Sequence, residues 1–74
     1  MPIIDTLATG KNIHQLCQKN HMKALDLADI LGFTTPRAIF KWFNGTNLPT
    51  LDNLVILAGL FKVTVDDILV IKIQ

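Results

Sequence analysis

Apolar residues recur along the chain at the spacing of short amphipathic helices. Between residues 23 and 31 they occupy positions i, i+3, i+4 and i+7, which places them on one face of a helix. This stripe consists of Ala24, Leu27, Ala28 and Leu31. Gly32 follows directly, and glycine is typical of a helix end because it readily adopts a left-handed backbone. The pattern therefore predicts a helix over residues 23–31 with one buried face.

Four further helices are predicted by similar spacing and by the residues that start or stop them. They cover about residues 9–19, residues 35–44, a stretch after Pro49, and a short stretch after Thr64. Thr35, Thr50 and Thr64 stand where a hydroxyl can accept a hydrogen bond from the free N–H groups of a first turn. Asp67 follows Thr64 by three residues, so the two resemble a capping box.

The two ends of the chain have a different pattern. Residues 70–74 read VIKIQ and residues 2–5 read PIID, and such β-branched, partly alternating runs favour strands. We expect two short strands that pair, either within the chain or across a dimer. The fold class is therefore all-α, a compact five-helix domain with two short terminal strands.

Size and composition limit the functions that this fold can carry. The chain has 74 residues, half of them apolar, which predicts one small domain over residues 1–74. Such a domain has little room for an enclosed active site, so we expect no enzyme activity, no cofactor and no small-molecule substrate. Residues 9–47 carry five cations and two aspartates, whereas the rest sums to −2. This uneven charge hints at an anionic partner.

The sequence also bears on where the protein works. No apolar run approaches the roughly 18 residues that span a bilayer, so no membrane association is expected. The first residues do not form a secretion signal, and the one cysteine, Cys17, has no partner for an internal disulfide. These features together predict a cytoplasmic protein.

His14, Cys17 and His21 would share a face of one continuous helix, as the ligands of a metal site would. Structural zinc normally has four ligands, and His21 is expected to lie beyond the helix end. Cys17 is more simply interpreted as a small buried apolar residue. We therefore predict no metal site.

The helix predicted over residues 35–44 carries two distinct faces. With about 100° between successive residues, Ile39, Trp42 and Phe43 fall on one side. Arg37, Lys41 and Asn44 fall on the other, and Phe40 lies at the boundary. The apolar side would anchor the helix to the core. The cationic side fits the DNA major groove, which admits one helix and where Arg or Lys can bind guanine.

The order of four segments resembles the phage-repressor-like helix-turn-helix proteins, also called the xenobiotic-response-element family. The segments read DLADILGF, AIFKWFNG, LPTLDNLVILAGLF and VTVDDIL, and the resemblance covers about residues 13–69. It implies five helices, with a helix-turn-helix at about residues 23–44. It also implies binding to double-stranded operator DNA, usually as a dimer, to regulate transcription, here as a repressor.

The resemblance also implies roles for individual residues. Five positions match those that face base edges, namely Thr35, Pro36, Arg37, Ala38 and Lys41. Lys23 and Asn44 match phosphate-contacting positions, and Thr46 and Asn47 fall in a loop that lies near the DNA backbone in relatives. Two features depart from the commonest family pattern: the turn GFTTP is one residue longer, and Pro36 can make only apolar contact with a base.

The helix after Pro49 is apolar nearly all round, because Val55, Ile56 and Leu60 lie off its core stripe. A second apolar face is typical of an interface. We therefore expect a homodimer that uses this helix, helped by the C-terminal strand. The same surplus of apolar surface, together with Phe40 and the small net charge, supports an alternative function. This alternative is a protein-interaction or dimerisation module on the same fold, such as an antitoxin-like component.

Overall fold

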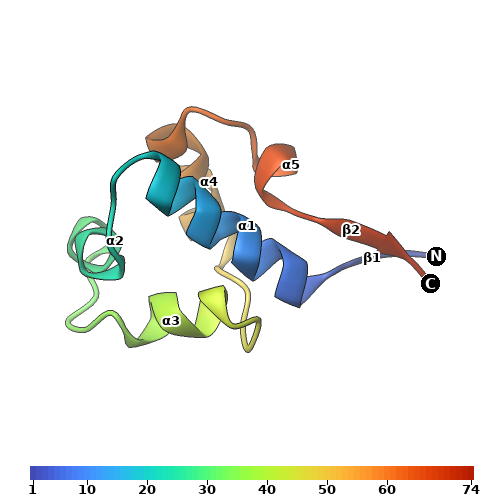
Figure 1. Ribbon diagram of the computed structural model, residues 1–74, viewed down its shortest axis with the longest axis horizontal. Helices are drawn as coiled ribbons and strands as arrows, with labels where there is room; N and C mark the ends of the chain where they lie inside the picture. Colours follow the sequence, from blue (N-terminus) through green and yellow to red (C-terminus); the bar gives the residue numbers. More distant parts are fainter.

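Five helices and two terminal strands make up the computed structural model, which describes all 74 residues. In chain order the elements are β1 (Pro2–Ile4), α1 (Thr6–Lys19), α2 (Ala24–Leu31), α3 (Arg37–Phe43), α4 (Leu51–Phe61), α5 (Val65–Ile68) and β2 (Ile71–Ile73). The two strands lie side by side at one end of the molecule, and α2 lies at the other end (Figure 1). The predicted fold class is confirmed.

Helix α1 begins three residues earlier than the predicted start at Thr9. The carboxylate of Asp5 accepts a hydrogen bond from the backbone N–H of Ala8 at 3.0 Å, so Asp5 is the cap. The prediction placed the helix start at about Thr9, but Thr9 and Gly10 are both buried within the helix. The prediction assigned Asp5 to the N-terminal strand run PIID, so its role as the helix cap was missed.

Helix α3 is shorter than the predicted span 35–44. Pro36 is its cap residue and Arg37 its first helical residue. Thr35 precedes a proline, and such a residue is disfavoured in the helical conformation. The hydroxyl of Thr35 nevertheless accepts a hydrogen bond from the N–H of Arg37 at 3.4 Å. Helix α2 begins one residue later than predicted, because Lys23 is its cap residue.

The predicted caps of α4 and α5 are confirmed. The hydroxyl of Thr50 accepts from the N–H of Asn53 at 3.3 Å. At α5 the hydroxyl of Thr64 accepts from the N–H of Asp67 at 3.1 Å, and the Asp67 carboxylate accepts from the N–H of Thr64 at 3.0 Å. The pKa of Asp67 is lowered by this backbone hydrogen bond and by a second bond to the Thr64 side chain.

This capping box predicts a contribution of Asp67 to acid sensitivity. A carboxyl with a lowered pKa in the folded state stabilises that state above its unfolded pKa of about 3.9. The stabilisation is lost as pH falls from about 4 through the lowered value. Thermal unfolding followed by circular dichroism at pH 7 and pH 3 should therefore show a smaller acid-induced fall in Tm for Asp67→Asn than for the wild type. An equal fall in both proteins would contradict the capping role.

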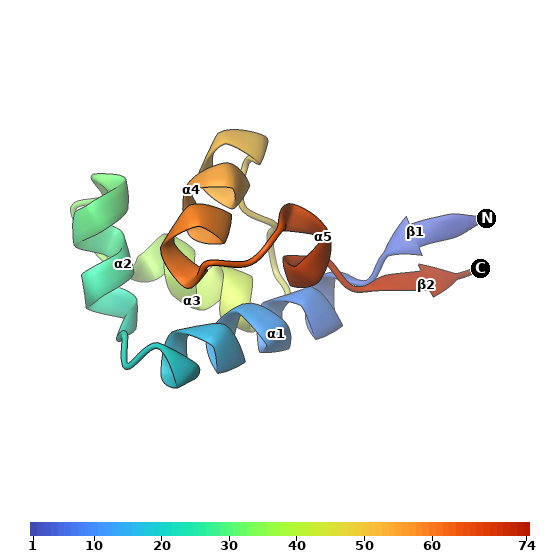
Figure 2. The ribbon, with the colours of Figure 1, turned by 90° about the horizontal axis from the view of Figure 1, so that it is seen from above.

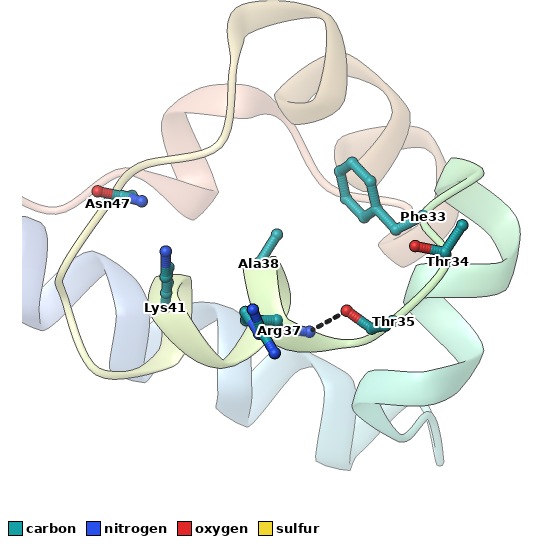
Figure 3. A pocket seen from close by; sticks show the side chains of 7 residues that line it. All are labelled: Phe33, Thr34, Thr35, Arg37, Ala38, Lys41 and Asn47. Carbon is teal, nitrogen blue, oxygen red and sulfur yellow. Dashed lines mark hydrogen bonds between the residues drawn. The ribbon is translucent and has the colours of Figure 1, made fainter.

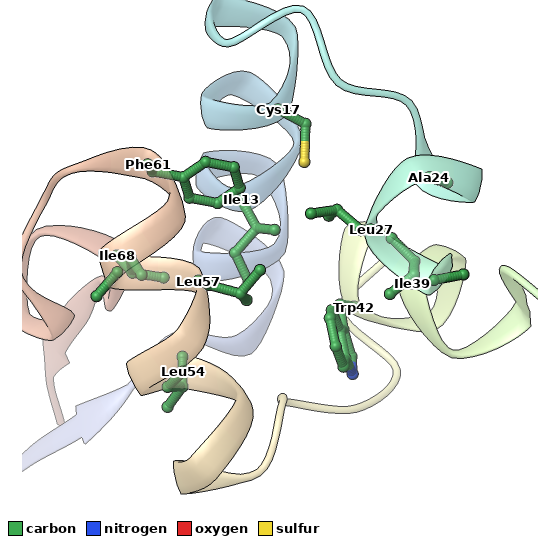
Figure 4. Packing of buried hydrophobic residues seen from close by; sticks show 12 residues of the cluster. Ile13, Cys17, Ala24, Leu27, Ile39, Trp42, Leu54, Leu57, Phe61 and Ile68 are labelled. Carbon is green, nitrogen blue, oxygen red and sulfur yellow. The ribbon is translucent and has the colours of Figure 1, made fainter. Parts of the chain in front are cut away.

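One fully buried side chain from each helix forms the centre of the core. These residues are Ile13, Leu27, Ile39, Leu57 and Ile68, and Figure 4 shows them converging between the helices. Burying an aliphatic side chain of this size contributes about 1.5–3 kcal/mol. Trp42 extends the core beneath α3 and meets Phe33 edge to face at a centroid distance of 6.0 Å. Helix α5 therefore contributes a fully buried side chain, Ile68, to the core although it has only four residues.

The terminal strands pair with each other antiparallel within the chain, with Ile3 opposite Lys72. This settles the alternative between pairing within the chain and pairing only across a dimer. The buried hydroxyl of Thr9 accepts from the N–H of Val70 at 2.9 Å and so ties the start of β2 to α1. None of the helices is both long and apolar enough to cross a membrane.

Candidate nucleic-acid interface

Helix α3 is held to the body of the molecule by one face and leaves the other free. Ile39 is fully buried and Trp42 is 4% exposed, whereas Arg37, Lys41 and Asn44 are exposed. This separation follows the predicted division of the helix. Phe43 is only half-buried, and its ring stacks on that of His14 from α1 at a centroid distance of 4.3 Å. Phe40 is 53% exposed at the boundary of the two faces.

The C-terminal end of α3 sits directly against α1 at Gly10. A Cβ atom added to Gly10 would lie 2.0 Å from the carbonyl oxygen of Trp42 and 2.9 Å from that of Phe43. No side chain fits in this space. The absence of a side chain at Gly10 therefore sets how closely α3 approaches α1, and so fixes the position of the cationic face relative to the core.

A concavity of about 290 Å³ adjoins the cationic face of α3. It is lined by Phe33, Thr34, Thr35, Arg37, Ala38, Lys41 and Asn47. Figure 3 shows these residues coming from three segments: the turn between α2 and α3, helix α3 itself, and the loop that follows it. The hydrogen bond drawn among them joins the N–H of Arg37 to the hydroxyl of Thr35. The charged groups of Arg37 and Lys41 are thus not engaged by the other lining residues.

The loop after α3 is folded back onto the helix end. The N–H groups of Thr46 and Asn47 both donate to the carbonyl of Lys41, at 2.9 Å and 3.3 Å. The side-chain oxygen of Asn44 accepts from the N–H and the hydroxyl of Thr46. Gly45 has a φ of +80°, a conformation that L side chains rarely adopt. These bonds hold the side chains of Thr46 and Asn47 exposed beside α3.

The structure brings together five of the nine predicted site residues in one concavity. These are Thr35, Arg37, Ala38, Lys41 and Asn47. Of the other four, Asn44 and Thr46 are exposed in the adjoining helix end and loop, Pro36 is half-buried at the helix start, and Lys23 is exposed at the start of α2. Phe33 and Thr34 also line the concavity but were not predicted. Both residues belong to the turn GFTTP, and the unusual length of that turn is the sequence feature that could have indicated them.

The surface so formed combines positive charge with hydrogen-bonding groups on a fixed helix. Arg37 offers a planar set of donors and Lys41 a mobile ammonium, while Thr34, Thr35 and Asn47 add uncharged donors and acceptors. Ala38 and Phe33 provide small apolar surface between them. This arrangement is better suited to an extended anionic partner that presents a series of hydrogen-bonding groups than to a small enclosed ligand.

The residues considered for a metal lie in different surroundings. His14 is exposed and stacks on Phe43, His21 is exposed beyond the end of α1, and Cys17 is buried. Burial raises the pKa of the Cys17 thiol to about 11, so it stays protonated at neutral pH and is a poor metal ligand. No group of three or more His, Cys, Asp or Glu side chains is placed to hold a metal ion.

Comparison with known protein families identifies the arrangement of α1 to α5. A family model described as helix-turn-helix matches residues 13–68, which is 56 of the 74 residues. The chain belongs to the Cro/C1-type helix-turn-helix family. This is a family of DNA-binding regulators found among phage repressors and xenobiotic-response-element-like proteins. No curated protein and no solved structure gave a significant match.

Membership of the helix-turn-helix family indicates which surface of this fold is expected to contact DNA. In this fold the second helix of the motif lies in the major groove and its residues contact base edges. That helix is α3, and its free face is the one that carries Arg37 and Lys41. The resemblance drawn from the sequence is confirmed by the family match, and the surface next to α3 becomes the candidate DNA-binding surface.

Proposed function

We propose that the protein is a sequence-specific transcription repressor that inserts α3 into the major groove of operator DNA. The observation that carries this proposal is the exposed Arg37 and Lys41 on a helix whose opposite face is locked into the core by Ile39 and Trp42. A side chain reads a base only if its helix is held in a defined place. A repressor of this kind blocks transcription by occupying its operator.

The site residues divide into two roles under this proposal. Arg37 and Lys41 donate to guanine O6 and N7, and Ala38, Thr35 and Pro36 contact neighbouring bases, with Pro36 restricted to apolar contact. The remaining residues position the protein by bonding to phosphates. They are Lys23 at the start of α2, Asn44 at the end of α3, and Thr46 and Asn47 in the following loop.

We also propose that the protein binds its operator as a homodimer. Two half-sites about one DNA turn apart require two readers related by a two-fold axis. One copy presents only one α3, so a second copy supplies the other. The operator is then expected to be a palindrome or near-palindrome.

The salt dependence of DNA affinity tests the proposal. Binding of DNA releases counterions, so log K should fall linearly with log salt concentration, by about 0.9 for each phosphate neutralised. We expect this steep fall in fluorescence anisotropy titrations of a labelled operator selected from a random DNA pool. Lys23→Ala should lower the slope by about 1 per bound copy and weaken all sequences alike. Recovery of no preferred sequence from the pool would overturn the proposed specificity.

A second candidate function is supported by exposed apolar side chains on α4. Leu51, Val55 and Ile56 are 73%, 59% and 45% exposed, and none of them is among the residues proposed to contact DNA. This surface fits a protein-interaction module, such as an antitoxin-like component. Such a module would bind DNA weakly and without preference for sequence, so the selection from a random pool distinguishes the two functions.

A further inference from the structure

Phe40 is a large apolar side chain of α3 that lies outside the core. It is 53% exposed, and it belongs neither to the buried cluster nor to the half-buried side chains packed against that cluster. With about 100° between successive residues, Phe40 lies about 160° from the buried Trp42 around the helix and about 60° from Arg37. Phe40 is therefore directed away from the core and stands next to the cationic residues.

The ring of Phe40 is held in place although it is exposed. It meets the ring of Phe43 edge to face, at a centroid distance of 6.1 Å and an interplanar angle of 82°. The ring of Phe43 in turn stacks on that of His14 from α1, at 4.3 Å. Edge-to-face and stacked pairs are the arrangements that aromatic rings prefer. The row His14–Phe43–Phe40 therefore begins on α1 and gives Phe40 a defined position on α3.

The two sides of Arg37 differ in shape and chemistry. Lys41 and Ala38 lie about 40° and about 100° from Arg37 around the helix, in the direction opposite to Phe40. Both line the concavity, and Figure 3 shows them pointing toward it. Phe40 is not among the lining residues. One flank of Arg37 is thus polar and concave, and the other is aromatic.

The outer side of α3 is not covered by the rest of the chain. Figure 1 shows α3 along the lower edge of the molecule, with no helix or strand beyond it. Figure 2 views the molecule from above and shows α3 behind α1 and α4. Both views leave the same side of the helix open. A DNA duplex that receives Arg37 would therefore also meet the ring of Phe40.

The chemistry of Phe40 limits what it can contact in a major groove. Its side chain can neither donate nor accept a conventional hydrogen bond, so it cannot pair with phosphates or with the polar atoms of the base edges. The apolar group on the major-groove edge of a base pair is the C5 methyl of thymine, which phenylalanine can contact. Pro36 lies one turn earlier, about 40° from Phe40 around the helix. The two form an apolar strip beside Arg37.

We propose that Phe40 is a specificity-determining residue that contacts the C5 methyl group of a thymine in the operator. The inference rests on the proposed function, because it requires α3 to lie in the major groove. Phe40 follows Arg37 by about 4.5 Å along the helix axis, and base pairs are about 3.4 Å apart. The thymine is therefore expected within about two base pairs of the guanine that Arg37 contacts.

Replacement of thymine by deoxyuridine tests this contact, because deoxyuridine lacks only the C5 methyl and pairs in the same way. Each thymine in one half-site of an operator selected from random DNA is replaced in turn, and affinity is measured by fluorescence anisotropy at fixed salt. Removal of the contacted methyl should weaken binding of the wild type about fourfold, which corresponds to about 0.8 kcal/mol for one methyl-sized group. Phe40→Ala should bind the operator more weakly, and it should bind that modified operator as well as the unmodified one.

Two further variants separate the methyl contact from other effects. Phe40→Leu keeps an apolar side chain at this position, so it should retain at least a twofold response to removal of the same methyl. Ile30→Ala removes an apolar side chain of α2 that is 50% exposed. It should bind both operators as the wild type does. Circular dichroism melts of all three variants establish that each is folded under the conditions of the titrations.

The possible results distinguish this inference from the proposed function. A wild type that tolerates deoxyuridine at every thymine overturns the inference, and so does an equal loss in the wild type and Phe40→Ala at every position. Unchanged operator affinity in Phe40→Ala also overturns it and assigns the ring to an apolar protein partner. In each of these cases an operator is still bound, so the proposed function stands. Recovery of no operator from the random pool overturns both.

Discussion

The double variant Arg37→Ala/Lys41→Ala should lose specific operator binding while remaining folded. Each good bidentate base contact contributes about 1–3 kcal/mol of discrimination. Loss of two such contacts, about 2–6 kcal/mol, lowers the preference for the operator roughly 30-fold to 10⁴-fold. Both side chains are exposed on α3, and substitutions of this kind usually change stability by less than about 0.5 kcal/mol. Binding is to be measured by anisotropy at fixed salt and unfolding by urea titration.

The matched control removes the same charge from another helix. Lys11 and Lys19 are exposed on α1, so Lys11→Ala/Lys19→Ala lowers the net charge equally without touching α3. This control should weaken specific and random DNA to the same small extent, because only the general attraction to phosphates is reduced. If the two double variants lose operator preference equally, then α3 is not the reading helix.

The exposed cationic face of α3, which we propose to face DNA, could be predicted from the sequence because a helix repeats regularly. The positions of Arg37 and Lys41 opposite Ile39 follow from about 100° per residue alone, and the structure places them as expected. The caps at Thr50 and Thr64 were equally accessible, since they depend on neighbours three residues away. Local rules therefore gave the helices and the orientation of α3.

Features that depend on distant parts of the chain were not accessible in the same way. The concavity beside α3 needs the turn that holds Phe33 and the loop that holds Asn47 to come together, and no spacing encodes that meeting. The start of α1 was predicted three residues too late, and no local spacing indicates why residue 10 is a glycine. Its actual surroundings are two carbonyls of α3 some thirty residues away in the sequence. Prediction from neighbouring residues therefore fails where a contact between distant parts of the chain determines the residue type.

The close contact between Gly10 and the end of α3 predicts that Gly10→Ala destabilises the protein. The new Cβ would lie 2.0 Å from the carbonyl oxygen of Trp42, far inside normal van der Waals contact. The neighbouring atoms are main chain on both sides, so relief requires α1 and α3 to move apart. Alanine favours a helix over glycine by about 1 kcal/mol, but overpacking costs about 1–3 kcal/mol and occasionally more. We expect a net destabilisation of about 2 kcal/mol or more.

A second glycine provides the control that isolates this clash. Gly59 lies within α4, is exposed, and an added Cβ there would meet nothing within 4 Å. Gly59→Ala should therefore stabilise the protein by up to about 1 kcal/mol through helix propensity alone. Urea unfolding followed by circular dichroism compares the two. A domain of this size has a total stability of roughly 4–11 kcal/mol, so the difference is readily measured.

The effect of Gly10→Ala should extend to DNA binding, because the same contact places α3. Displacement of the C-terminal end of α3 shifts Lys41 and the folded-back loop, whose N–H groups bond to the Lys41 carbonyl. Operator affinity should therefore fall even at temperatures where the variant is folded, whereas Gly59→Ala should bind as the wild type does. Equal stability and equal operator affinity in both variants would show that α1 does not hold the reading helix by this close approach.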